Sequence, residues 1–150
     1  MKTIVGSAEC LVFVYGTLQE GQANEKVAAS YVQKRWRGRI KGRLYHLTDR
    51  GYPAVLLEEE GVVWGECLQL KQPEKALQAL DALEEYFGPD DVRNEYDRRR
   101  CLVCSDDGQE WKAYVYVWPQ GKSLPKKTTV LPEGCWPAKR QIQRPPACLL

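Results

Sequence analysis

The sequence of 150 residues lacks the features that mark several large classes of protein. Its charge is nearly balanced, since 22 Lys and Arg stand against 20 Asp and Glu and leave a formal net charge of +2. A charge so close to zero argues against a protein whose main role is to bind nucleic acid. Long apolar runs are also absent, because stretches such as 11–15 and 62–64 are far shorter than the roughly 20 residues of a membrane-spanning helix. We therefore expect no nucleic-acid partner and no membrane span.

The N-terminus lacks the pattern of a secretory signal. Lys2 is followed by Gly6, Ser7 and Glu9 before any apolar stretch, whereas a signal peptide has a charged, an apolar and a small-residue zone in that order. We expect a cytoplasmic protein, and in that compartment cysteines are kept as reduced thiols. The six cysteines stand at positions 10, 67, 101, 104, 135 and 148.

Metal ligands are scarce. Cys101 and Cys104 have the spacing of half a zinc knuckle, but they lie in a predicted strand, where residues three apart point to opposite faces. The only histidine is His46, and no second Cys-x-x-Cys pair supplies the remaining ligands of a structural zinc site. We predict no metal site and interpret the thiols as buried or incidental.

Hydrophobic periodicity predicts about six strands and two helices. The predicted strands cover residues 10–15, 35–44, 54–57, 62–70, 96–104 and 113–118. The predicted helices cover residues 24–33 and 73–86, and Gly88 and Pro89 are expected to stop the second. Residues 58–61, three Glu and a Gly, are typical of a hairpin turn between the strands on either side.

These elements predict the α+β class. So many strands in so short a chain favour a curled or closed, antiparallel-rich β-barrel flanked by short helices, because closure removes exposed strand edges. No repeat and no second domain are visible, so residues 1–150 are expected to form a single domain. From about residue 137 the chain has little to pack with, and we expect this tail to be loosely held.

The segment 35–44 alternates strictly between basic residues and apolar or small ones. Arg35, Arg37 and Arg39 fall on one side and Trp36 and Ile40 on the other, which is typical of a half-exposed strand. Aromatic residues interleaved with basic ones also suit nucleic-acid binding, but on a strand Trp36 points away from the arginines and does not stack beside them. A salt-sensitive affinity for nucleic acid would support that alternative.

The helix predicted over 73–86 carries a carboxylate on its apolar side. When the segment is wound at roughly 100° per residue, Leu77, Leu80 and Leu83 lie on the apolar face. Glu84 lies roughly 50° from the centre of that face, whereas Glu85 lies roughly 150° away. Glu84 is therefore expected to point inward and Glu85 to point to water.

An inward-facing carboxylate loses hydration, which raises its pKa and prepares it to accept and return a proton near neutral pH. Glu84 is accordingly a candidate general acid and base. The alternative is that Glu84 lies at the rim of the core and forms an ion pair with Arg98 or Arg99. Helix geometry alone leaves both interpretations open.

A second candidate site is the segment Tyr15, Gly16, Thr17 and Leu18, where a buried strand breaks into a turn before a predicted helix. Gly16 lets the backbone approach a ligand without a Cβ in the way. Successive N–H groups at such a strand end converge on an oxygen that becomes negative, as in an oxyanion hole. The alternative is that Gly16 marks only a turn.

Together these segments resemble the gamma-glutamylcyclotransferase-like superfamily, in the branch that includes gamma-glutamylamine cyclotransferases and related small bacterial proteins. The resemblance covers most of the chain. Its segments are 12–18, 21–24, 51–54, 63–66, 80–84, 96–98, 113–116 and 134–136. It implies a small mixed β-barrel flanked by helices. It also implies that Glu84, in Leu-Asp-x-x-Glu, is the catalytic residue and that the Tyr-Gly-x-Leu loop, 15–18, binds substrate.

The chain departs from this family pattern at one position. Many relatives have Gly directly after the catalytic glutamate, whereas here Glu85 and Tyr86 are expected to extend the helix before Gly88. The stretch 87–94 before Tyr96 is also expected to reshape the mouth of the pocket. Both features bear on substrate identity more than on chemistry.

The resemblance implies release of 5-oxoproline and a free amine from a small gamma-glutamyl substrate, by attack of the α-amine on the side-chain carbonyl. No cofactor is expected, because nucleophile and electrophile belong to one molecule. Tyr96 and Tyr116 are candidate substrate-binding residues, with simple packing as the alternative. The alternative for the whole chain is a non-catalytic small-molecule-binding protein of the same fold. The leaving amine and the oligomeric state are left open.

Overall fold

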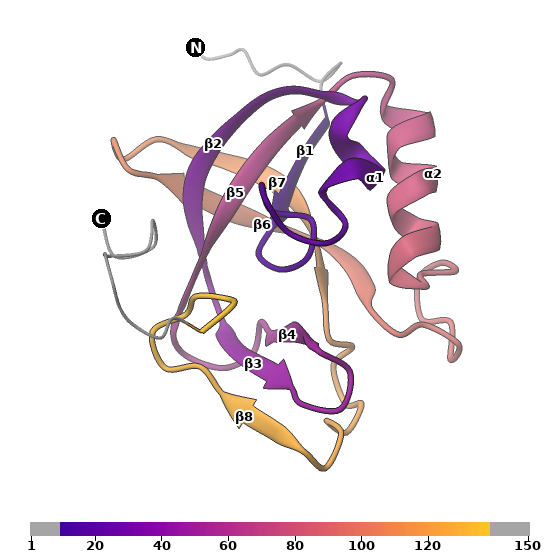
Figure 1. Ribbon diagram of the computed structural model, residues 1–150, viewed down its shortest axis with the longest axis vertical. Helices are drawn as coiled ribbons and strands as arrows, with labels where there is room; N and C mark the ends of the chain where they lie inside the picture. The colour runs from indigo at the N-terminus through magenta and orange to yellow at the C-terminus, as the bar shows by residue number, and fades with distance from the viewer. Residues whose placement is uncertain (1–9, 139–150) are drawn as a thin grey trace.

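The computed structural model describes residues 10–138, and its centre is a five-stranded closed barrel (Figure 1). The barrel strands are β1 (Cys10–Val14), β2 (Val32–Lys41), β5 (Val62–Leu70), β6 (Asp97–Ser105) and β7 (Glu110–Val117). Their order is β1-β5-β2-β6-β7, and β1 closes the barrel by pairing in parallel with β7, while the other neighbours pair antiparallel. The predicted α+β class and antiparallel-rich barrel are confirmed.

A second, smaller sheet lies below the barrel in Figure 1. It has the order β4-β3-β8 and consists of β4 (Tyr52–Leu56), β3 (Arg43–Leu47) and β8 (Thr128–Val130). β8 was not predicted, because three residues are too few to show a period of two.

The single strand predicted over 35–44 is wrong, since the chain leaves the barrel at Gly42 and begins β3 at Arg43. Gly42 has φ 151°, and a Cβ there would lie 2.9 Å from Val55 Cγ1. The Gly42 amide donates to the carbonyl of Gly61 (3.1 Å), so the chain crosses between the two sheets here. The predicted hairpin at 58–61 is wrong for the same reason: β4 pairs with β3, whereas β5 pairs with β1 and β2.

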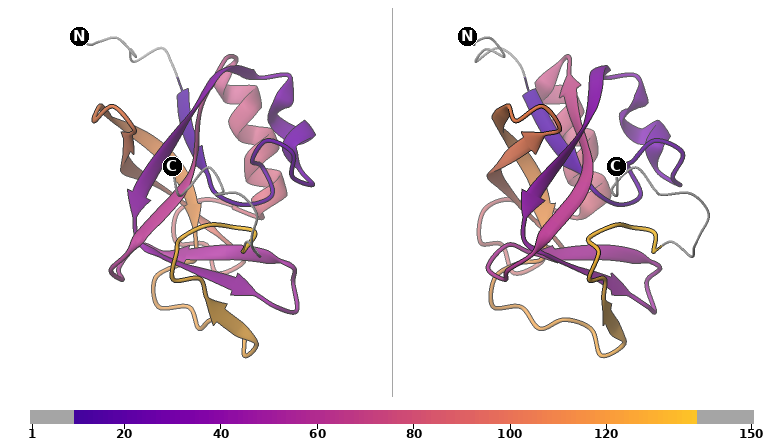
Figure 2. Two further views of the ribbon diagram at one scale, coloured as in Figure 1. Left: turned by 60° about the vertical axis from the view of Figure 1, so that its left-hand side comes forward. Right: turned by 90° about the vertical axis from the view of Figure 1, so that its left-hand side faces the viewer.

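Two helices pack side by side outside the barrel (Figure 2). α1 (Glu25–Ala29) is shorter than predicted, because β2 already begins at Val32. α2 (Pro73–Glu84) ends two residues earlier than predicted, because Glu85 adopts the left-handed conformation with φ 57° and ψ 50°. The amide of Tyr86 then donates to the carbonyl of Asp81 (2.9 Å), which closes the last turn of the helix.

All residues of β1 are buried, because the strand is covered on both faces. Val12 and Val14 pack with Leu80 of α2, and Leu11 and Phe13 pack in a separate cluster with residues of the other barrel strands. β1 is therefore held rigidly up to the point where the loop 15–18 begins.

The thiols follow the prediction only in part. Cys10, Cys67, Cys101 and Cys104 are free, as expected, but Cys135 is disulfide-bonded, so the expectation of a reduced thiol is wrong there. The expected loose tail falls mostly on residues 139–150, which lie outside the described residues, as do Cys148 and the N-terminal residues 1–9. Within 10–138, neither helix combines the length and hydropathy needed to span a membrane.

Candidate active site

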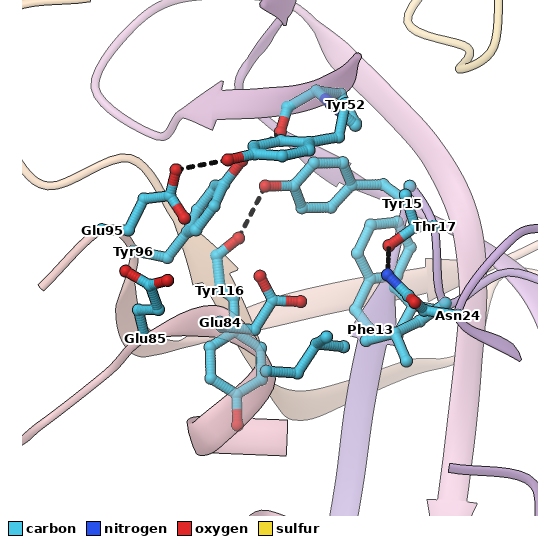
Figure 3. Close-up of a pocket in the computed structure, with 15 residues that line it drawn as sticks. Phe13, Tyr15, Thr17, Asn24, Tyr52, Glu84, Glu85, Glu95, Tyr96 and Tyr116 are labelled. Atoms are coloured by element: carbon cyan, nitrogen blue, oxygen red, sulfur yellow. Dashed lines mark hydrogen bonds between the residues drawn. The ribbon is translucent and has the colours of Figure 1, made fainter. Parts of the chain in front are cut away.

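A cavity of about 230 Å³ lies where β1 ends (Figure 3). Its walls are the end of β1 with the loop 15–18, the C-terminal end of α2, the start of β4, residues 95–96 before β6, and Tyr116 of β7. It contains every residue that the sequence predicted for the site. These are Glu84, Tyr15, Gly16, Thr17, Leu18, Tyr96 and Tyr116.

The loop 15–18 is shaped by a close approach and by one side chain. A Cβ on Gly16 would lie 2.8 Å from Cγ of Pro53, so only glycine fits between the loop and β4. Asn24 binds Thr17 through two hydrogen bonds. Its backbone N–H donates to the Thr17 carbonyl (2.8 Å), and its side-chain Nδ2 donates to Thr17 Oγ1 (2.9 Å). Within residues 10–138 the backbone amides of Thr17 and Leu18 donate no hydrogen bond, so they are available to a ligand oxygen.

Glu84 is the last residue of α2, and its carboxylate points into the cavity (Figure 3). Burial, followed by the nearby charge of Glu95, raises the pKa of this carboxyl to about 7. The carboxylate of Glu84 forms no hydrogen bond or ion pair with any residue in the described part of the chain. The group can therefore hold or release a proton at neutral pH, as a general acid and base must.

The alternative of an ion pair with Arg98 or Arg99 is wrong. Arg98 Nη1 lies 2.7 Å from Asp81 Oδ2, and Arg99 Nη1 lies 2.8 Å from Glu58 Oε2. Both arginines are thus paired with other carboxylates, which leaves Glu84 to the cavity.

The three predicted tyrosines line the cavity, but their hydroxyl groups are engaged within the protein. Tyr15 donates to the carbonyl of Tyr116 (2.6 Å), and Tyr96 donates to the carbonyl of Pro53 (2.6 Å). The Tyr116 hydroxyl donates to Asp81 Oδ1 (2.6 Å) and points away from the centre of the cavity (Figure 3). The tyrosines therefore offer ring surfaces to a ligand.

Sequence reasoning missed Glu95, which shares the cavity wall with Glu84. Glu95 Oε2 accepts hydrogen bonds from the hydroxyl of Tyr52 (2.5 Å) and from Arg50 Nη1 (2.6 Å). Burial and this carboxylate raise the pKa of Tyr52 to about 12. No periodic pattern could have indicated Glu95, because it lies in the irregular stretch before β6.

Within residues 10–138, no group of three or more His, Cys, Asp and Glu side chains is arranged to bind a metal ion.

Comparison with known proteins decides the family. Residues 12–138 match the model of a family described as gamma-glutamyl cyclotransferase, AIG2-like. The chain belongs to this family.

A gamma-glutamyl cyclotransferase of Niallia circulans that acts on gamma-L-glutamyl-butirosin B is 40% identical over 107 residues, or 71% of this chain. Those residues make up 65% of that relative, so the chain spans about two thirds of its length. Among solved structures, an AIG2-like protein from mouse superposes with a TM-score of 0.61 at 24% identity, covering 77% of this chain and 80% of the mouse chain. YkqA from Bacillus subtilis superposes with a TM-score of 0.59 at 24% identity, covering 85% of this chain and 39% of that protein. The two structures establish the shared fold.

The structure explains how this member of the gamma-glutamyl cyclotransferase family departs from the pattern after Glu84. The sequence predicted that Glu85 extends the helix, and this is wrong. Glu85 instead occupies the left-handed region that favours glycine. The backbone thus ends the helix in the way a glycine would, and the carboxylate of Glu85 is added to the cavity wall.

Proposed function

We propose that the protein converts a gamma-glutamyl amide into 5-oxoproline and a free amine. The observation that carries this proposal is Glu84, an unpaired carboxylate with a pKa of about 7 that lines the same small cavity as the loop 15–18, whose Thr17 and Leu18 amides donate no hydrogen bond within residues 10–138. The family and the activity of the Niallia circulans relative support the same reaction class.

In the proposed reaction the carboxylate of Glu84 takes a proton from the α-ammonium group of the substrate. The freed amine attacks the side-chain carbonyl carbon, and a new C–N bond closes a five-membered ring. The amides of Thr17 and Leu18 stabilise the oxyanion that develops on the carbonyl oxygen. Protonated Glu84 then gives its proton to the departing nitrogen as the original amide C–N bond breaks.

The size of the cavity fits this chemistry. A volume of about 230 Å³ is below the roughly 300 to 1,000 Å³ of sites for drug-sized ligands, so it suits a glutamyl group more than a large molecule. The rings of Tyr15, Tyr96 and Tyr116 restrict how that group folds, and a fixed conformation favours ring closure. The reaction needs no cofactor, because both reacting groups belong to the substrate.

The test is to incubate the protein and Glu84→Gln with a panel of gamma-glutamyl amides and to measure 5-oxoproline. The panel contains ε-linked lysine, a polyamine, an amino-acid amide and a dipeptide. Glu60→Gln, which removes an exposed carboxylate that does not line the cavity, is the matched control. We expect product from the wild type and from the control but not from Glu84→Gln.

Equal rates for the wild type and Glu84→Gln would remove Glu84 from the mechanism. A wild type that binds 5-oxoproline tightly but releases none from any amide would favour the non-catalytic binding protein instead. Calorimetric titration with 5-oxoproline separates these outcomes.

A further inference from the structure

We infer that Asp81 is a positioning residue that fixes the helix carrying Glu84 relative to the loop 15–18. This inference rests on the proposed function, because it concerns the distance between the proton-transferring group and the amides that face it. Its physical basis is a continuous chain of hydrogen bonds that runs from α2 through β7 to the loop.

The first hydrogen bond of this series begins on α2. Asp81 lies three residues before Glu84, so the two side chains leave the helix about 60° apart and on the same side. Asp81 Oδ1 accepts a hydrogen bond from the Tyr116 hydroxyl (2.6 Å). This bond joins the last turns of α2 to β7.

The second part joins β7 to the loop. The backbone carbonyl of Tyr116 accepts a hydrogen bond from the hydroxyl of Tyr15 (2.6 Å), the residue directly before Gly16. Tyr15 is 6% and Tyr116 is 4% exposed, so the bond between them is shielded from water, whereas the Asp81 end of the link is partly buried. One tyrosine therefore binds Asp81 with its side chain and holds the start of the loop with its backbone.

Asp81 is itself held in one orientation. Arg98 Nη1 donates to both of its oxygens, at 2.7 Å and 2.8 Å. The guanidinium of Arg98 lies 5.1 Å from the ring centre of Tyr86 and 5.0 Å from that of Tyr114, so it cannot swing freely.

Glu84 and Asp81 therefore have different roles. The carboxylate of Asp81 is occupied by charge-assisted hydrogen bonds, whereas that of Glu84 is unpaired and faces the cavity. Burial, and then the hydrogen bond to Asp81, raise the pKa of Tyr116 far above its usual value, so that hydroxyl stays a donor at all ordinary pH values. Asp81 acts on the reaction through geometry and exchanges no proton with the substrate.

The kinetic test uses Asp81→Asn and Tyr116→Phe. Tyr116→Phe removes only the hydroxyl and keeps the carbonyl that Tyr15 binds. Displacing a reacting group by about 1 Å costs up to roughly 100-fold in rate. We therefore expect each variant to lower kcat by about 10-fold to 100-fold with little change in KM, and the pH midpoint set by Glu84 to stay in place. Because both substitutions break the same link, the double variant should be no slower than Asp81→Asn alone.

The matched control is Asp106→Asn, which breaks the ion pair between Arg37 and Asp106 (3.1 Å). Neither of these residues lines the cavity. It should leave kcat unchanged even if it lowers the melting temperature. Unchanged kcat in Asp81→Asn, or multiplicative losses in the double variant, would overturn the inference.

A second measurement does not depend on turnover. Amide hydrogen exchange of residues 15–18 should become faster in Asp81→Asn and stay unchanged in Asp106→Asn. If the wild type released no 5-oxoproline from any amide, the proposed function would fail, and this exchange experiment would still test whether Asp81 orders the loop. Unaltered exchange in Asp81→Asn would overturn the inference regardless of activity.

Discussion

Two cavities among residues 10–138 differ in size and in whether their charged side chains are paired. A groove of about 470 Å³ lies between β2 and the turn that joins β6 to β7, against about 230 Å³ for the cavity at Glu84. Charged side chains line both. In the groove Arg37 pairs with Asp106, and Arg35 pairs with Glu66 of the neighbouring strand β5. In the small cavity Glu84 has no partner among the described residues, and its pKa is displaced.

The comparison teaches that volume alone does not identify a site. A paired surface charge contributes little beyond solubility and local structure. An unpaired carboxylate that is held away from water is costly to keep, and such groups concentrate at functional sites. The following predictions test whether the two cavities differ in this way.

The largest expected effect is on turnover. General acid and base groups contribute roughly 100-fold to 10,000-fold to rate, so Glu84→Gln should lower kcat/KM by that order. Lys34→Ala, in the groove, should stay within a factor of about two. Initial rates of 5-oxoproline release measure both, and a comparable loss in Lys34→Ala would mean that the groove takes part in the reaction.

The next effect is on stability as a function of pH. The folded protein holds a proton on Glu84 up to about pH 7, whereas the unfolded chain loses it near pH 4.5, so the folded state binds more protons between these values. Its free energy of unfolding must therefore fall as pH rises through this window, by at most about 3 kcal/mol from this group. Urea unfolding at pH 4.5 and pH 8 should show this loss in the wild type and a smaller one in Glu84→Gln. Identical pH slopes would show that Glu84 is not held away from water.

A third effect concerns the helix end beside Glu84. A non-glycine residue in the left-handed region costs about 1 kcal/mol, so Glu85→Gly should raise the free energy of unfolding by about that amount. Glu85→Ala keeps the unfavourable Cβ and should give no such gain, which makes it the control. Chemical denaturation measures both. If Glu85→Ala stabilised the protein as much as Glu85→Gly, the effect would come from the carboxylate and not from the backbone.

The smallest effect should come from Glu95. Its negative charge raises the pKa of Glu84, so Glu95→Gln should move the acidic limb of the kcat/KM profile to lower pH. Asp107→Asn, at the groove, should leave the limb in place. A shift to higher pH in Glu95→Gln would contradict the assigned cause.

Local periodicity was enough to predict that Glu84 points inward, although not what it does there. The residue lies on a regular helix, and its direction depends only on the positions of nearby leucines, so winding the segment placed it correctly. The strands of the barrel were found for the same reason, since alternation is a local signal. The sequence did not predict correctly which strands pair. Strands β4 and β5 were expected to form a hairpin, yet they belong to different sheets.

By itself, the sequence determined the α+β class, most strands of the barrel, a carboxylate on the inner side of a helix and, separately, a glycine turn after the first strand. These depend on contacts between residues close along the chain. The tertiary structure alone decided that Arg98 binds Asp81, leaving Glu84 unpaired, and that Glu95 stands on the same wall. The partners in these contacts are 17 residues apart for Asp81 and Arg98 and 35 for Asp81 and Tyr116. Closure of the barrel brings such residues together, and no periodic pattern of the chain encodes that event.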